Sequence, residues 1–325
     1  MSTLTVSDVP LGAESPAQRL RRTAAAVRVR LRWWGVHRAL SQSQKEEMGA
    51  VASADARLLT AGKKLIDSRH EAVRQLTSVR TRLTHFWRGL TLPYTEPGIR
   101  LIRQADIESF THAMEGYREE LVEAEAGLAA AYGEIKDDAR RRLGRLFDPG
   151  DYPQEVRGLF GVDYDFPSVE PPSYLLRIAP DVYEQERRRV AARFDEAVRL
   201  AEQAFAAEFA RLLAHLTERL GDGEGGTRKV FRDSAVANLG EFFSRFSQLN
   251  VRSNPELDAL VEQAQELVRG VAPQDLRDDG GLRRTIAAQM TEVQSRVERM
   301  IVDAPRRRIV RPQASSNGGS HATAG

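Results

Sequence analysis

The chain has 325 residues and a formal net charge of +2, so net charge favours neither nucleic acid nor membrane as a partner. Cysteine is absent, which excludes disulfides, thiolate metal sites and cysteine nucleophiles. Because no apolar run approaches the roughly 18–20 residues of a membrane helix, and the N-terminus carries no hydrophobic signal segment, we predict a cytoplasmic protein with no membrane partner.

Residues 1–18 are polar and interrupted by prolines and a glycine, so we expect a disordered leader. The segment 27–34 then alternates between an apolar face and a basic face. A period of two in β-branched and aromatic residues predicts a strand. Its two faces carry Val27, Val29, Leu31 and Trp33 on one side and Arg28, Arg30, Arg32 and Trp34 on the other.

Two long stretches with helical spacing follow, over residues 44–90 and 103–146. Prolines and a glycine between residues 91 and 98 indicate a turn that joins them. A helix, a short turn and a second helix predict a long antiparallel, coiled-coil-like hairpin over residues 44–146.

Residues 147–180 are rich in both prolines and aromatic side chains. A free linker would not keep so many aromatic residues in water, so we expect an ordered connector. Within it, residues 162–166 and 174–178 favour extended structure. We predict that they pair with the strand at 27–34, which places a small β element near residues 27–34 and 160–178.

The most regular helix is predicted over residues 181–220, because its apolar stripe repeats every eleven residues. Asp181 and Glu184 have the spacing of a capping box at its start. A helix of roughly 60 Å, at about 1.5 Å per residue, needs an equally long partner. The stripe consists of Phe194, Val198, Ala201, Phe205, Phe209, Leu212, Leu216 and Leu220.

Further helices are predicted between residues 228 and 303. The segment 304–325 begins with arginines and continues as a Ser/Gly/Ala-rich stretch, so we expect a disordered tail. Residues 19–303 are therefore predicted to form one elongated, mainly α domain.

Candidate catalytic and metal-binding patterns are weak. The glycine-rich loop at 221–226 follows a helix and lacks the Lys-Ser/Thr pair of a phosphate-binding loop, which favours an interhelix hinge. The histidines are dispersed and no Glu-x-x-His repeat is present, so we predict no metal and no cofactor. Asp163 and Asp165 are spaced to share one face of an extended segment, either as an acid/base pair or as turn caps.

The order of these elements, with several short segments, resembles a bacterial protein family defined by a domain of unknown function. Members are often encoded beside a MoxR-type AAA+ ATPase and a von Willebrand A-domain protein. The resemblance implies an AAA+ system as the context and carries no catalytic signature. The segments concerned are 29–33, Tyr94 with Pro97, Phe110 with Tyr117, 237–242 with Arg245 and Phe246, and 275–279.

Two functional interpretations follow. The first is a non-enzymatic scaffold or adaptor that binds a protein partner, or a second copy, through the stripe residues Phe194, Val198, Phe205, Phe209, Leu212 and Leu216. The alternative is nucleic-acid binding, because no acid occurs between Glu14 and Glu46. Its candidate contacts are Arg28, Arg30, Arg32 and Trp34; a solvated strand face that pairs with acids elsewhere explains the same pattern. An enzyme is the least favoured interpretation.

Overall fold

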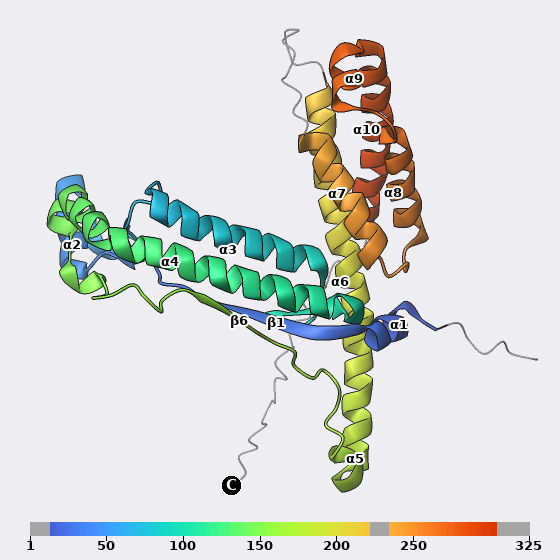
Figure 1. The fold of residues 1–325 in the computed structure, drawn as a ribbon, viewed down its shortest axis with the longest axis horizontal. Coiled ribbons are helices and arrows are strands. Elements are labelled where there is room, and N and C mark those ends of the chain that lie inside the picture. Colours follow the sequence, from blue (N-terminus) through green and yellow to red (C-terminus); the bar gives the residue numbers. More distant parts are fainter. Residues whose placement is uncertain (1–13, 222–233, 304–325) are drawn as a thin grey trace, which may run out of the picture. The chain divides into compact units, whose positions relative to one another are not determined.

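The computed structural model describes residues 14–221 and 234–303, and Figure 1 shows its elements. Helices predominate in this part of the chain and the strands are antiparallel, which confirms the predicted mainly α class with a small sheet. The chain clusters into two compact units. Unit 1 comprises residues 1–205 and 237–258, and unit 2 comprises residues 206–236 and 259–325, so the predicted 19–303 domain contributes to both. The predicted tail, 304–325, and most of the predicted leader lie outside the described residues.

The first half of the chain contains α1 (Pro16–Thr23), β1 (Ala24–Arg32), β2 (His37–Ala39), α2 (Gln42–Ala52), η1 (Ala56–Leu58), β3 (Gly62–Lys64), α3 (Glu71–Leu90), β4 (Thr91–Pro93), β5 (Ile99–Arg103), η2 (Gln104–Asp106), α4 (Ile107–Leu143) and η3 (Gly144–Leu146). The second half contains η4 (Pro149–Asp151), β6 (Gly161–Asp165), α5 (Leu175–Ile178), α6 (Pro180–Leu220), α7 (Ser234–Leu249), α8 (Pro255–Val268), α9 (Pro273–Asp278) and α10 (Gly280–Asp303).

The main sheet has the strand order β4-β5-β1-β6 with antiparallel pairing throughout. The predicted strand at 27–34 is present as β1, and its predicted partner near 162–166 is β6, with Arg30 opposite Asp163. The prediction for 174–178 was wrong, because this segment forms the short helix α5. Strand β4 lies within the segment predicted as a turn, and β5, which was not predicted, lies between that turn and the predicted helix and overlaps the helix only at Arg103.

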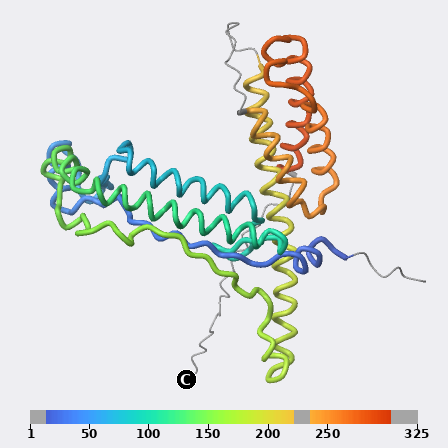
Figure 2. The backbone as a smooth tube through the Cα atoms, viewed as in Figure 1, coloured from blue at the N-terminus to red at the C-terminus, as the bar shows by residue number. Residues whose placement is uncertain are grey.

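One face of the sheet is covered by the helical pair α3 and α4, which Figure 2 shows running side by side. The apolar face of β1 packs into this core through Val27 and Val29, together with Phe110 and Met114 of α4. Burying such side chains removes apolar area from water at about 25 cal/mol per Å², which is the main force holding the sheet to the helices.

The predicted helix over 44–90 was wrong in its first half. Helix α2 ends at Ala52, where Ser53 takes a left-handed conformation with φ of 52°. Strand β3 then pairs with β2, and α3 begins only at Glu71, after His70 caps it by accepting from the amide of Ala72 at 3.3 Å. These breaks leave Leu58 exposed.

The opposite face of the sheet is apolar at the β4–β5 end, where Ala26, Leu92 and Leu101 are buried. Contacts near this end tie the first half of α6 and helix α7 to the sheet. The Tyr94 and Phe194 rings lie 5.7 Å apart, and Arg103 Nη1 donates to the carbonyl of Gln248 at 3.1 Å. The other half of this face carries the arginines of β1.

Helix α6 confirms the predicted long helix and begins at Pro180. The carbonyl of Ala179 accepts the amide of Tyr183 at 3.0 Å, so Asp181 lies within the first turn and is not the predicted N-cap. Proline is well tolerated at the first helical position, because its missing N–H would have no partner there.

Unit 2 is built from the last turns of α6, most of α8, and helices α9 and α10. Its core includes Leu213 and Leu216 of α6 with Met290 and Val293 of α10. The hydroxyl of Thr217 lies 3.0 Å from Gln294 Oε1. The short helix α9 was not predicted.

Candidate interaction surfaces

The arginines of β1 lie opposite acidic residues of β6. Asp165 accepts from Arg28 Nε at 3.0 Å and Nη2 at 2.5 Å, and from Arg30 Nη2 at 3.4 Å. The hydrogen bonds from Arg28 hold the pKa of the Asp165 carboxyl below its usual value. Two of the three predicted nucleic-acid-binding arginines therefore already have an anionic partner within the chain.

The third arginine, Arg32, is exposed and lies across the backbone of Gly161, where an added Cβ would be 2.6 Å from Arg32 Nη2. The prediction that Trp34 continues the arginine face was wrong. Strand β1 ends at Arg32, so the alternation stops there. The Trp34 ring is half-buried and packs edge-on against Tyr132 of α4 at 6.3 Å.

The two aspartates of the connector share a face, as predicted, and they are strand residues, not turn caps. Both lie within β6 and project from the side of β1 that carries the arginines. Between them, Tyr164 points the other way and packs against Phe110 at 5.3 Å. Asp163 also lies 3.9 Å from Arg118 Nη2. The aspartates thus balance arginines on a solvated face.

The predicted interaction stripe of α6 is largely buried by the chain itself. Phe194, Val198, Phe205, Phe209 and Leu216 are all buried. Leu212 is only half-buried, and the adjacent Leu213 takes the buried position. In unit 1, Phe205 packs edge-on against Phe246 at 5.1 Å. The stripe serves as core, and an available apolar surface has to be found elsewhere.

Such a surface lies immediately before and within the first turn of α6. We define residues 174–182 as the contact segment. It contains four large apolar side chains that are exposed to solvent, namely Tyr174, Leu176, Ile178 and Val182. Large apolar side chains gathered in one exposed segment mark interaction sites more often than scattered ones do. Sequence reasoning missed this surface, because it assigned residues 174–178 to a sheet.

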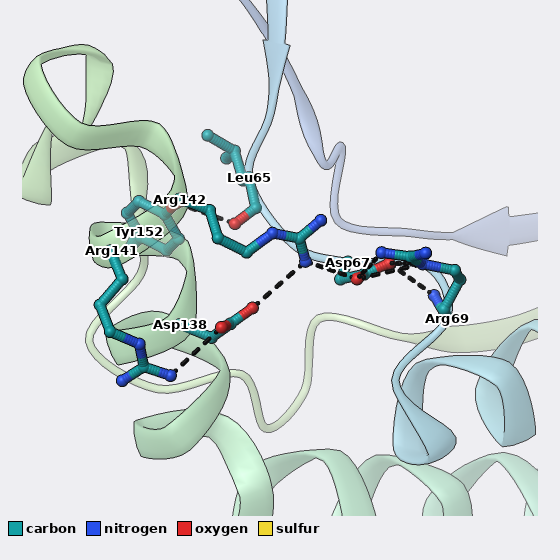
Figure 3. Close-up of polar contacts among 7 residues, drawn as sticks. All are labelled: Leu65, Asp67, Arg69, Asp138, Arg141, Arg142 and Tyr152. Atoms are coloured by element: carbon teal, nitrogen blue, oxygen red, sulfur yellow. Dashed lines mark hydrogen bonds and ion pairs between the residues drawn. The ribbon is translucent and has the colours of Figure 1, made fainter.

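A second polar region lies where α4 ends (Figure 3). Asp67 accepts two hydrogen bonds from the Arg69 side chain and one from the Arg69 amide, and Arg142 Nη1 approaches it at 2.5 Å. The hydrogen bonds from Arg69, and to a smaller extent that from Arg142, place the pKa of the Asp67 carboxyl far below its usual range. Arg142 also reaches Asp138 at 3.3 Å, so it bridges two acids.

Beside this network, three largely buried polar contacts hold the β3 region. Lys63 Nζ donates to the carbonyl of Leu146 at 2.6 Å and forms an ion pair with Asp151 at 2.7 Å. Tyr152 donates its hydroxyl to the carbonyl of Leu65 at 2.8 Å, as Figure 3 shows. Burial, with a smaller effect from Asp151, raises the pKa of Tyr152 to about 12.

A cavity of about 490 Å³ is lined by Asp67, Arg69, Asp138 and Arg142 among others. Its two acids pair with its two arginines, Asp67 with Arg69 and Arg142, and Asp138 with Arg142. Across residues 14–221 and 234–303, no three His, Asp or Glu side chains are grouped to hold a metal ion. None of the helices in these ranges is long and apolar enough to cross a bilayer. Most of the 221–226 loop and the 306–311 arginines lie outside the described residues.

Comparison with known proteins gives no relative. No protein-family model matches the chain, and neither the curated proteins nor the solved structures contain a significant match. Its function must therefore be inferred from its own geometry.

Proposed function

We propose that this protein is a non-enzymatic helical scaffold or adaptor that acts in the cytoplasm through protein–protein contacts made by the contact segment, residues 174–182. The supporting observation is the exposure of its apolar side chains: Tyr174, Leu176, Ile178 and Val182 retain 58%, 57%, 69% and 43% of their accessible surface. Exposed apolar side chains lower the solubility of a protein, so a binding function would explain why this set stays exposed.

The size of the segment indicates how a partner would bind it. Full burial of a Leu or Ile side chain stabilises by about 1.5–3 kcal/mol, so covering four partly exposed ones contributes roughly 4 kcal/mol before the cost of association. A stable flat interface buries about 800 Å² per partner, far more than four side chains supply. This favours insertion into an apolar groove of a different protein over flat pairing of two copies.

Ion pairs connect both flanks of the contact segment to other parts of unit 1, namely helix α1 and the turn between β4 and β5. On one side, Arg21 Nε donates to Glu170 Oε1 at 2.7 Å. On the other, Arg193 of α6 pairs with Glu96 at 2.7 Å. Because the flanks are held, a partner has fewer backbone and side-chain rotations to freeze, and less of the contact energy is lost to ordering.

The family resemblance suggests the first partner to test, which is an AAA+ ATPase. In this proposal the long helices act as a coiled-coil-like frame that supports the contact segment and needs no substrate pocket of its own.

The experiment compares two variants that each replace four exposed apolar residues with serine. The test variant carries Tyr174→Ser, Leu176→Ser, Ile178→Ser and Val182→Ser; the control carries Met48→Ser, Val51→Ser, Leu58→Ser and Val122→Ser, which are also exposed. Each tagged protein is recovered from native lysate with and without nuclease, and the retained protein is identified, purified and titrated against the variants.

We expect the partner to bind the wild type and the control equally, and the test variant at least 10-fold more weakly. Equal binding of both variants, with matching circular dichroism spectra, would remove the contact segment as the interface. Failure to retain any protein on the wild type would contradict the adaptor function itself.

Nucleic-acid binding is the less supported alternative, because Asp165 already pairs with Arg28 and Arg30, and Trp34 packs against Tyr132. The nuclease arm separates the two functions. Nucleic acid that is retained, and that dissociates steeply with salt, would favour the alternative.

A further inference from the structure

A small cavity of about 160 Å³ lies within unit 1, between the paired strands β2 and β3 and the helices α3 and α4. Its inner surface is mostly apolar and includes Leu76, Leu128 and Phe160. Its polar lining residues carry either nitrogen atoms or hydroxyl groups, and none of them is an acid: they are His37, Lys64, Arg80, Ser68 and Thr77.

The two strand residues of this set face one another. His37 and Lys64 are direct partners in the β2–β3 register, and such neighbours have Cβ atoms about 4.5–5.5 Å apart. Within the described residues Lys64 forms no ion pair. The nearest acid in the sequence, Asp67, is held by Arg69 and Arg142 as Figure 3 shows, so it does not neutralise Lys64.

Arg80 is positioned by an aromatic ring. Its guanidinium carbon lies 4.7 Å from the centroid of the Trp33 ring, and Trp33 in turn packs edge-on against Phe160 at 4.9 Å. A cation held over an indole keeps its positive charge and its donors, and it loses little conformational freedom when an anion binds. The cavity therefore combines an apolar floor with cations, Lys64 and Arg80, that have no acidic partner in the part of the chain that the structure describes.

We propose that this cavity binds a small monocarboxylic acid with a compact apolar body, the carboxylate on Arg80 and Lys64 and the apolar body on Leu76, Leu128 and Phe160. At about 30 Å³ per water, the cavity has room for about five waters, well below the roughly 300 Å³ of a drug-sized site. This size excludes nucleotides and long-chain lipids. An inorganic anion would leave the apolar floor uncovered, and a neutral apolar molecule would leave both cations unpaired.

The site is separate from the contact segment, so the result of its test does not depend on the adaptor function. The probe is 3-methylbutanoate, titrated into the full chain by calorimetry and by tryptophan fluorescence. Trp33→Phe identifies the part of the fluorescence signal that comes from the cavity. We expect one site per chain with a Kd of about 1 mM or lower. The neutral analogue 3-methylbutanamide, acetate and inorganic phosphate should each bind at least about 10-fold more weakly, because each lacks either the charge or the apolar body.

Matched variants locate the charges. Arg80→Met and Lys64→Met keep an unbranched apolar side chain and remove the cation, and we expect each to weaken 3-methylbutanoate binding by about 10-fold. Arg74→Met is the control, since Arg74 lies on the same helix, is exposed and pairs with Glu71. This control should bind as the wild type does. Comparison of the folded spectra of the three variants excludes unfolding as the cause.

Equal affinity for the acid and its amide, or unchanged binding in Lys64→Met and Arg80→Met, overturns the proposal. A peptide that ends in leucine with a free carboxylate provides the last arm. If it binds and its C-terminally amidated form does not, while 3-methylbutanoate fails to bind, the cavity is a site for protein C-termini and the small-acid proposal is wrong.

Discussion

Two ion pairs of unit 1 join distant parts of the chain in opposite environments. Lys63 and Asp151 keep only 5% and 19% of their side-chain surface exposed, whereas Arg28 and Asp165 keep 35% and 40%. The acid-free arginine segment attracts attention in the sequence, and Lys63 does not. The Lys63–Asp151 pair should nevertheless matter more for stability than the Arg28–Asp165 pair. A buried charge that loses its partner is strongly destabilising, whereas an exposed pair is screened by water.

The largest effect is expected from Lys63→Met. It leaves the largely buried Asp151 carboxylate with only Arg38, 4.0 Å away, and removes the donor of the Leu146 carbonyl, so unit 1 should lose roughly 3 kcal/mol of unfolding free energy. Urea unfolding followed by tryptophan fluorescence reports on this unit, since Trp33, Trp34 and Trp87 all lie in it. The double variant Lys63→Met/Asp151→Leu should recover most of the loss. A loss below about 1 kcal/mol in the single variant would show that water reaches the pair.

An intermediate effect is expected from Tyr152→Phe. The variant removes the hydrogen bond to the Leu65 carbonyl, which is worth about 1 kcal/mol. The Tyr152 pKa is raised to about 12, against about 10 when unfolded, so the native state holds its proton over that range. Stability should therefore fall as pH rises from 10 to 12.

The same titration supplies the check. The unfolding free energy should fall less steeply with pH in Tyr152→Phe than in the wild type. Some pH dependence remains in the variant, because burial also raises the pKa values of Tyr94 and Tyr132. Identical slopes in variant and wild type, measured as urea midpoints at successive pH values, would exclude Tyr152 as a contributor.

The smallest effect is expected from Arg28→Gln, with a change in Tm of about 2 °C or less, because the Arg28–Asp165 pair is solvated. The Asp165 pKa is lowered by Arg28, so the contribution of the pair exists above the unfolded pKa of about 4 and disappears as pH falls through the lowered value. Variant and wild type should converge in acid when their Tm values are compared by calorimetry. A Tm loss as large as that of Lys63→Met would show that the exposed pair stabilises unit 1 as much as the buried pair does.

Periodicity predicted the elements whose burial is one-sided and regular. The α6 stripe has the helical period over many turns, and β1 alternates Val27 and Val29 with arginines, so both could be located from the sequence. Strand β4 could not, because Thr91–Pro93 is too short to show a period and ends in a residue that usually argues against a strand. It exists because β5 supplies its hydrogen bonds.

The surfaces were harder to predict than the fold. Whether an apolar side chain is exposed depends on what the rest of the chain covers. From the sequence, Phe205 and Ile178 look equally suited to bind a partner, but only Ile178 is exposed. The small cavity draws Trp33, Lys64, Arg80 and Phe160 from separate elements. No spacing rule connects such residues, because the paired strands β2 and β3 and the helices α3 and α4 bring them together only after folding.

The burial of Lys63 has a practical consequence. It is adjacent to Lys64, which is exposed, and lysine is rare in this arginine-rich chain. Acylating reagents modify neutral amines in water, so Lys64 should react readily and Lys63 only while the segment around β3 is open. The ratio of Lys63 to Lys64 modification within one peptide then measures how often this segment opens, and the faster-reacting Lys64 serves as the internal standard.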